Sequence, residues 1–257
     1  MSERIAVQPA IVLLIAVPLL AMAATACTGR AVRANTDAAP ILLFTGTGTS
    51  PGDVAALETI LTANHLVYAT ASSAELNAMA QDGIGRYRLL IVPGGNFVEI
   101  GNSLTREATA NIRDGVQNGL NYLGICAGAF LAGSFPQPYR SLNLTSGVQF
   151  GFYAAIRRVH KTAIAISIAG GPTLDQYWED GPQLSGWGTV AAKYPDGTPA
   201  IVQGAFGNGW VILTGVHPEA PETWRRGMTF STPASTDNAF AATLIQAALN
   251  RTPLSHF

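Results

Sequence analysis

The first half of the chain alternates short apolar runs with stretches whose apolar residues recur at helical spacing. Four apolar runs have the length of buried strands, at residues 41–45, 66–70, 87–92 and 121–125. Between them, apolar residues three and four positions apart predict helices at residues 51–65, 74–81 and 103–118. Strands that alternate with helices predict right-handed crossovers and a parallel sheet covered on both faces.

The second half has a different pattern, with apolar runs joined by short connections. Strands are predicted at residues 159–168, 188–193, 199–205 and 209–214, and Gly207-Asn208-Gly209 is a hairpin signal. Two helices are expected near residues 221–228 and 235–249. The pattern therefore predicts an α/β domain with a mostly parallel sheet and an added antiparallel region in the C-terminal half.

Composition supports one packed domain and gives no sign of nucleic-acid binding. Of 257 residues, 48% are hydrophobic and 12% charged, which disfavours disorder. The formal net charge is −1, and the charges are scattered along the chain, whereas nucleic-acid binding needs a concentrated basic patch. No linker divides residues 40–257, so we expect a single domain there.

The N-terminus has the pattern of an export signal. An apolar run at residues 9–24 follows Arg4 and leads into Ala24-Thr25-Ala26-Cys27. We predict a signal peptide over residues 1–26, lipid attachment at Cys27 as in a bacterial lipobox, and a tether over residues 27–39. The alternatives are a soluble secreted or periplasmic form, and an uncleaved anchor, for which the run falls short of the roughly 20 residues of a span. Each alternative places the domain outside the cytoplasm.

The strongest chemical signal is Gly124-Ile125-Cys126-Ala127-Gly128, where an apolar strand meets a helix. This is the form of a nucleophile elbow, in which glycines allow a sharp turn that exposes the nucleophile. The positive end of the following helix would favour a thiolate at Cys126. The alternative is a buried structural cysteine, which behaves as a small hydrophobe.

A base and an oxyanion hole are predicted at other strand ends. His217 follows the strand at residues 209–214, and Glu219 is close enough to orient its ring. The alternatives are a turn histidine bonded to backbone and a solvated acid. Gly95 lies in a Gly-Gly turn after the third strand, and its N–H would join that of Ala127 in an oxyanion hole.

These motifs resemble the class I glutamine amidotransferase-like superfamily, and more narrowly the family of the biotin–protein ligase N-terminal domain. The resemblance implies a flavodoxin-like three-layer sandwich, with Cys126 as nucleophile, His217 as base and Glu219 as the orienting acid. Residues 175–182 look like a family loop that is unusually acidic here. The candidate substrate-binding residues are Asn96, Tyr177 and Glu179.

Export changes the function that this resemblance implies. Glutamine amidotransferases of this class supply ammonia to an ATP-dependent synthetase, but outside the cytoplasm we expect neither a supply of ATP nor an attached synthetase domain. We therefore expect a stand-alone cysteine hydrolase that cleaves a small-molecule or peptide-like amide through a thioester, without cofactor or metal. The alternatives are a non-catalytic envelope lipoprotein that binds or scaffolds, and a redox-sensing thiol. The sequence identifies no protein partner.

Overall fold

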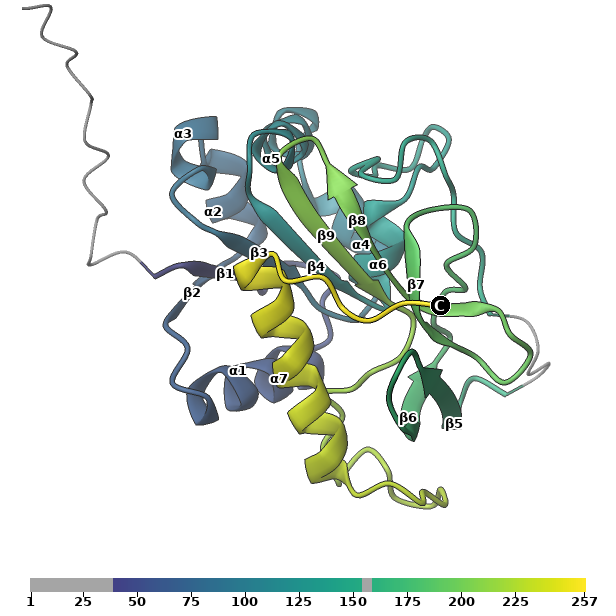
Figure 1. Ribbon diagram of the computed structural model, residues 1–257. Helices are drawn as coiled ribbons and strands as arrows, with labels where there is room; N and C mark the ends of the chain where they lie inside the picture. The colour runs from purple at the N-terminus through teal and green to yellow at the C-terminus, as the bar shows by residue number, and fades with distance from the viewer. Residues whose placement is uncertain (1–38, 154–158) are drawn as a thin grey trace, which may run out of the picture. The chain divides into compact units, whose positions relative to one another are not determined.

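A computed structural model describes residues 39–153 and 159–257, which form a nine-stranded mixed sheet with helices on both faces (Figure 1). The predicted signal peptide, Cys27 and residues 27–38 of the predicted tether lie outside the described residues. In chain order the elements are β1 (Ile41–Phe44), α1 (Pro51–Ala63), β2 (Tyr68–Ala71), α2 (Ser73–Ala78), α3 (Gln81–Ile84), β3 (Leu89–Val92), α4 (Phe97–Ser103), α5 (Arg106–Gln117), β4 (Asn121–Ile125), α6 (Ala127–Ala132), β5 (Lys161–Ile168), β6 (Thr173–Glu179), β7 (Thr189–Lys193), β8 (Pro199–Phe206), β9 (Gly209–Thr214) and α7 (Ala234–Asn250).

Five parallel strands, in the order β2-β1-β3-β4-β9, form one half of the sheet. Strand β2 lies on one side of β1 in the sheet, whereas β3 and then β4 lie on its other side. The loops that follow β1 and β3 therefore diverge, and in open α/β sheets a crevice at this point is where ligands bind. The candidate site lies at this edge of the sheet.

Four antiparallel pairs extend the sheet beyond β9, through β8, β7, β5 and β6. The sheet is thus evenly mixed, and the expectation of a mostly parallel sheet was wrong in this respect. Much of the segment predicted as a loop at residues 175–182 belongs to strand β6, which pairs with β5 along its length. The resemblance had implied a loop here, but Gln176, Tyr177 and Trp178 are buried.

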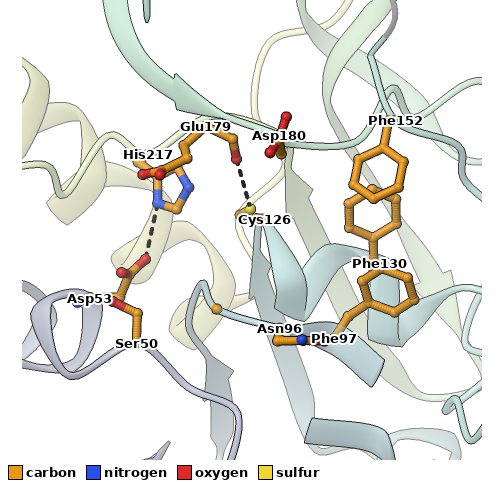
Figure 2. A pocket seen from close by; sticks show the side chains of 11 residues that line it. Ser50, Asp53, Asn96, Phe97, Cys126, Phe130, Phe152, Glu179, Asp180 and His217 are labelled. Atoms are coloured by element: carbon orange, nitrogen blue, oxygen red, sulfur yellow. Dashed lines mark hydrogen bonds and ion pairs between the residues drawn. The ribbon is translucent and has the colours of Figure 1, made fainter. Parts of the chain in front are cut away.

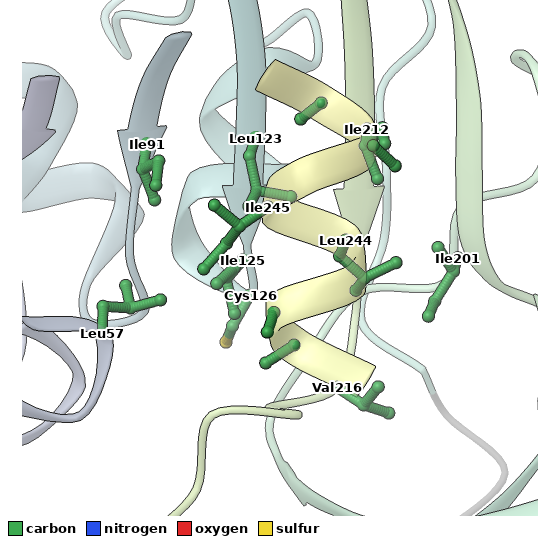
Figure 3. Packing of buried hydrophobic residues seen from close by; sticks show 14 of the residues in the cluster. Leu57, Ile91, Leu123, Ile125, Cys126, Ile201, Ile212, Val216, Leu244 and Ile245 are labelled. Atoms are coloured by element: carbon green, nitrogen blue, oxygen red, sulfur yellow. The ribbon is translucent and has the colours of Figure 1, made fainter. Parts of the chain in front are cut away.

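The two faces of the sheet carry two hydrophobic clusters. In β1, Ile41 and Leu43 belong to one cluster, and Leu42 and Phe44 to the other. Helices α1 and α7 cover the first face, and α2 to α6 cover the second. Figure 3 shows α7 lying over β4 and β9. Burial on both faces explains why these strands are continuous apolar runs.

Two predicted helices differ from the structure. The helix expected at residues 103–118 corresponds to α5, which begins at Arg106 because Leu104 is extended and Thr105 caps the helix, whereas α4 before it was not predicted. Residues 221–228 form successive turns with hydrogen bonds between residues three apart, such as Trp224 N–H to the Pro221 carbonyl, and no α-helix. Among the described residues, no helix combines the length and apolarity needed to cross a membrane.

Candidate active site

Cys126 occupies a strained turn between β4 and α6. Its backbone angles are φ 48° and ψ −101°, a left-handed conformation that a non-glycine residue adopts only at a cost. A Cβ on Gly124 would lie 2.6 Å from the Gly128 carbonyl carbon, and one on Gly128 would lie 2.0 Å from the Val92 carbonyl oxygen. Both positions therefore require glycine, as the nucleophile elbow predicts.

A cavity of about 440 Å³ opens at the elbow. Ser50, Asp53 and His217 line one end, and a group of phenylalanines lines the other (Figure 2). Cys126 lies between these ends, although it is only 6% exposed. The volume is within the range of small-molecule sites.

His217 follows β9 and is held by both its backbone and its ring. Its N–H donates to the Tyr177 carbonyl oxygen at 2.8 Å, in an isolated antiparallel bridge to β6. Its Nδ1 lies 2.9 Å from Glu219 Oε1, and both side chains are buried. Because Nδ1 is used by Glu219, Nε2 is the ring nitrogen available to the cavity.

A second carboxylate, that of Asp53, contacts the same ring nitrogen. Asp53 Oδ1 lies 3.1 Å from His217 Nδ1, and the residue is 5% exposed. Nδ1 carries one proton for two carboxylates and lies closer to Glu219, so Asp53 acts on the ring mainly through its charge. Sequence reasoning missed Asp53, because an acid in the first turn of a helix is common and Asp53 occupies such a position in α1.

The three buried groups shift one another's protonation. Burial works to lower the pKa of His217, but the facing Cys126, Glu219 and Asp53 outweigh it and raise that pKa well above its ordinary value. Burial works to raise the pKa of Asp53, and the charge and hydrogen bonding of His217 reverse this to a lowered pKa. Burial raises the pKa of Glu219, and His217 offsets only part of that effect. The surroundings of the His217 ring therefore favour its protonated form.

The thiol has a different hydrogen-bond partner. Cys126 Sγ lies 3.6 Å from the Glu179 carbonyl oxygen and donates to it. Across residues 39–153 and 159–257, no hydrogen bond joins Cys126 to His217, although both line the cavity. The two side chains face the same space, as Figure 2 shows.

Several backbone N–H groups at the site have no acceptor within the described part of the chain, and those of Gly95 and Ala127 are among them. An isolated bridge between Thr49 and Gly95 uses the neighbouring N–H groups of Ser50 and Asn96, and leaves that of Gly95 unpaired. Gly95 has φ 140° and lines the cavity. An oxyanion hole requires unpaired N–H donors of this kind.

The candidate substrate-binding residues have different surroundings. Asn96 and Glu179 line the cavity, but the Asn96 side-chain oxygen accepts hydrogen bonds from the first turn of α4. Tyr177 does not line the cavity, and its hydroxyl donates to Glu179 Oε2 at 2.5 Å. Phe97, Phe130 and Phe152, which do line it, carry no sequence signal that separates them from core residues.

The described residues include one cluster with the spacing of a metal site. Single ligand atoms of Asp53, His217 and Glu219 lie within 4.8 Å of one another. A cation bound at His217 Nδ1 would displace the hydrogen bond to Glu219, so a metal site and an orienting acid exclude each other here.

Comparisons with known proteins agree with the fold. Residues 39–158 match the family described as "Biotin-protein ligase, N terminal". No curated protein matches the chain. A solved glutamine amidotransferase has 18% identity and a TM-score of 0.59, with 81% of this chain and 98% of that chain covered. PurLQS from Thermotoga maritima has 17% identity and a TM-score of 0.56, with 83% and 98% covered. A beta-galactosidase from Bacillus circulans has 13% identity and a TM-score of 0.52, with 84% and 32% covered. Identities this low indicate a shared fold only.

Proposed function

Residues 39–158 belong to the biotin–protein ligase N-terminal family and the chain has a glutamine amidotransferase-like fold, and from this premise we propose a stand-alone cysteine amide hydrolase. The observation that carries the proposal is the cavity shared by Cys126 and His217. A strained cysteine turn and a buried histidine with two carboxylates are costly to maintain, and such features cluster at active sites. The order of the five parallel strands further supports a flavodoxin-like arrangement of that half of the sheet.

In the proposed acylation step, the Cys126 thiolate attacks the carbonyl carbon of an amide. The N–H groups of Gly95 and Ala127 donate to the oxygen that becomes negative. The C–N bond then breaks, a C–S bond forms, and the His217 imidazolium gives its proton to the departing amine. The products of this step are a free amine and a thioester on Cys126.

In the proposed deacylation step, neutral His217 takes a proton from water as the water attacks the thioester. The C–S bond breaks, the carboxylic acid leaves, and the thiolate–imidazolium pair is restored. Glu219 keeps the ring in one orientation, and Asp53 adds a second negative charge that stabilises the imidazolium. The raised pKa of His217, whose burial is outweighed by Cys126, Glu219 and Asp53, supports this resting pair.

The test compares the reaction of Cys126 with iodoacetamide near neutral pH in wild type and in His217→Gln. The hydrolase proposal expects labelling faster than that of a free cysteine, slowed by about 10²-fold or more without the base. Glutamine keeps a donor for Glu219, and a melting curve of each variant checks that it is folded. Slow labelling that is indifferent to His217 and rises only on unfolding would reject the proposal.

A second candidate function is a binding module that retains the fold without catalysis. It is favoured by the hydrogen bond from the thiol to the Glu179 carbonyl, which leaves Sγ without a bond to His217. The same labelling experiment separates the two, because a thiol held by a carbonyl oxygen and not activated by histidine reacts slowly.

We also propose that the domain is exported and anchored to the membrane of the cell envelope through a lipid on Cys27. The support is the apolar run that ends in Ala26-Cys27. Changing Cys27 to Ser should move the protein from the membrane fraction to the soluble fraction. A Cys27→Ser protein that stays in the membrane fraction with residues 1–26 intact would indicate an uncleaved anchor. A wild-type protein already in the soluble fraction would indicate plain secretion.

A further inference from the structure

Three phenylalanines from separate parts of the chain form the end of the cavity opposite His217, and we name Phe97, Phe130 and Phe152 the phenylalanine wall. The ring centroids of Phe97 and Phe130 are 4.7 Å apart, and those of Phe130 and Phe152 are 4.9 Å apart. Figure 2 shows the three rings in one column beside Cys126. Each of the three lines the cavity.

Burial in the core does not explain the position of Phe152, the outermost ring of the wall. Phe130 is 2% exposed, but Phe152 is 56% exposed. Its backbone is nevertheless fixed: Phe152 bridges to Pro182, and the Tyr153 N–H donates to the Gly181 carbonyl oxygen at 3.0 Å. An exposed aromatic side chain at the mouth of a cavity adds little to the stability of the fold, and such residues commonly contribute to binding.

Two residues of the phenylalanine wall are close in sequence to the proposed reacting groups. Phe130 follows Cys126 by about one turn of α6, and Phe97 begins α4 directly after the Gly95-Asn96 turn. In amide hydrolysis the amine must leave beside the acid that protonates it, which places the amine portion at the His217 end. The acyl portion then extends from Cys126 toward the opposite end, where the wall lies.

We propose that the substrate's acyl portion carries an aromatic ring that packs on the phenylalanine wall. This inference rests on the proposed hydrolase function and names its substrate class: amides of arylalkyl carboxylic acids, including peptide bonds that follow an aromatic residue. A cavity of about 440 Å³ has room for such a group together with the scissile amide. Phe152 is a specificity-determining residue and takes no part in bond breaking.

The experiment uses two thiol-directed probes that share one electrophile. The chloromethyl ketone of hydrocinnamic acid carries a phenyl ring on its acyl side, and that of propionic acid does not. Full-length protein is treated with each, the adduct at Cys126 is quantified by peptide mass spectrometry, and both rates are divided by those of free cysteine. The aromatic probe is expected to react about tenfold faster, the preference that an aromatic contact of about 1.4 kcal/mol gives.

Phe152→Ser should reduce that preference to about threefold or less. Phe257→Ser is the matched control, because Phe257 is 57% exposed and lies outside the cavity lining; it should retain the wild-type preference. Fast labelling by both probes with a ratio near one, or a ratio unaffected by Phe152→Ser, overturns the aromatic assignment and leaves the hydrolase proposal standing. Labelling of Cys126 by neither probe faster than free cysteine overturns both.

Discussion

Replacing Gly128 with alanine tests whether α6 packs on β3 closely enough to form the elbow. Gly128 is the second residue of α6, and its N–H donates to the Pro93 carbonyl oxygen at 3.2 Å. Its own carbonyl oxygen accepts a hydrogen bond from the Tyr122 hydroxyl at 2.7 Å. The helix that carries Cys126 is thus attached to the end of β3 by contacts that a single methyl group would disturb.

The magnitude follows from one distance. The added Cβ would lie 2.0 Å from the Val92 carbonyl oxygen, whereas real Cβ contacts essentially never fall below 3.0 Å. The helix must therefore move by at least the difference, 3.0 − 2.0 = 1.0 Å. Overpacking of this kind costs about 1–3 kcal/mol or more, and each weakened hydrogen bond adds about 1 kcal/mol. The better helix propensity of alanine returns about 1 kcal/mol, so we expect a net loss of about 3 kcal/mol.

Thermal unfolding and Cys126 labelling measure the effect together. For a domain of this size, a loss of about 3 kcal/mol lowers the melting temperature by about 6–12 °C. Labelling by iodoacetamide near neutral pH should also slow, because the elbow no longer presents the thiol to the cavity. Gly151→Ala is the control, since its Cβ would meet only Gln183 Nε2, at 3.9 Å. A Gly128→Ala protein that melts and labels like Gly151→Ala would refute the close approach and the elbow with it.

Three further changes test the charge and packing around the site. Asp53→Asn removes a carboxylate that lies 3.1 Å from His217 Nδ1. The attraction between this carboxylate and the imidazolium is at least about 1 kcal/mol even at the dielectric constant of water, so labelling of Cys126 near neutral pH should slow at least about fivefold. A wild-type labelling rate would contradict a role for Asp53. Despite burial, which lowers it, the pKa of His217 is raised by Cys126, Glu219 and Asp53. The protonated ring therefore stabilises the folded protein fully below the ordinary histidine pKa of 6.5, and this stabilisation is lost as pH rises through the folded-state pKa. The stability gap between wild type and His217→Gln in urea should therefore be largest near pH 6 and shrink in alkali, whereas a gap that widens with pH would show the opposite shift. Ile245→Ala opens a cavity between α7 and the sheet and should lower the free energy of unfolding in urea by about 2–5 kcal/mol. Thr243→Ala, at an exposed position of the same helix, should change it little. Equal stabilities of the two variants would mean that α7 is not packed as described.

Local sequence was sufficient for the parallel half of the sheet and for the position of the elbow. Strands β1, β3 and β4 are buried on both faces, and such strands must be continuous apolar runs that can be recognised without knowing their neighbours. Cys126 between glycines, directly after β4, is equally local, because the turn itself restricts which residues fit. Glu219 contacts His217 at 2.9 Å, and both belong to one short loop.

Only the tertiary structure decided which distant groups complete the site. Asp53 reaches His217 because β1 and β9 belong to one sheet and both end at the same edge, a relation that no local spacing encodes. The phenylalanine wall likewise gathers side chains from α4, α6 and the segment before β5, each of which resembles an ordinary core residue in its own stretch of sequence. Strand β6 was missed for a related reason: an edge strand is defined by the partner it pairs with, and its mixture of acidic and aromatic residues favours a strand only once β5 lies beside it.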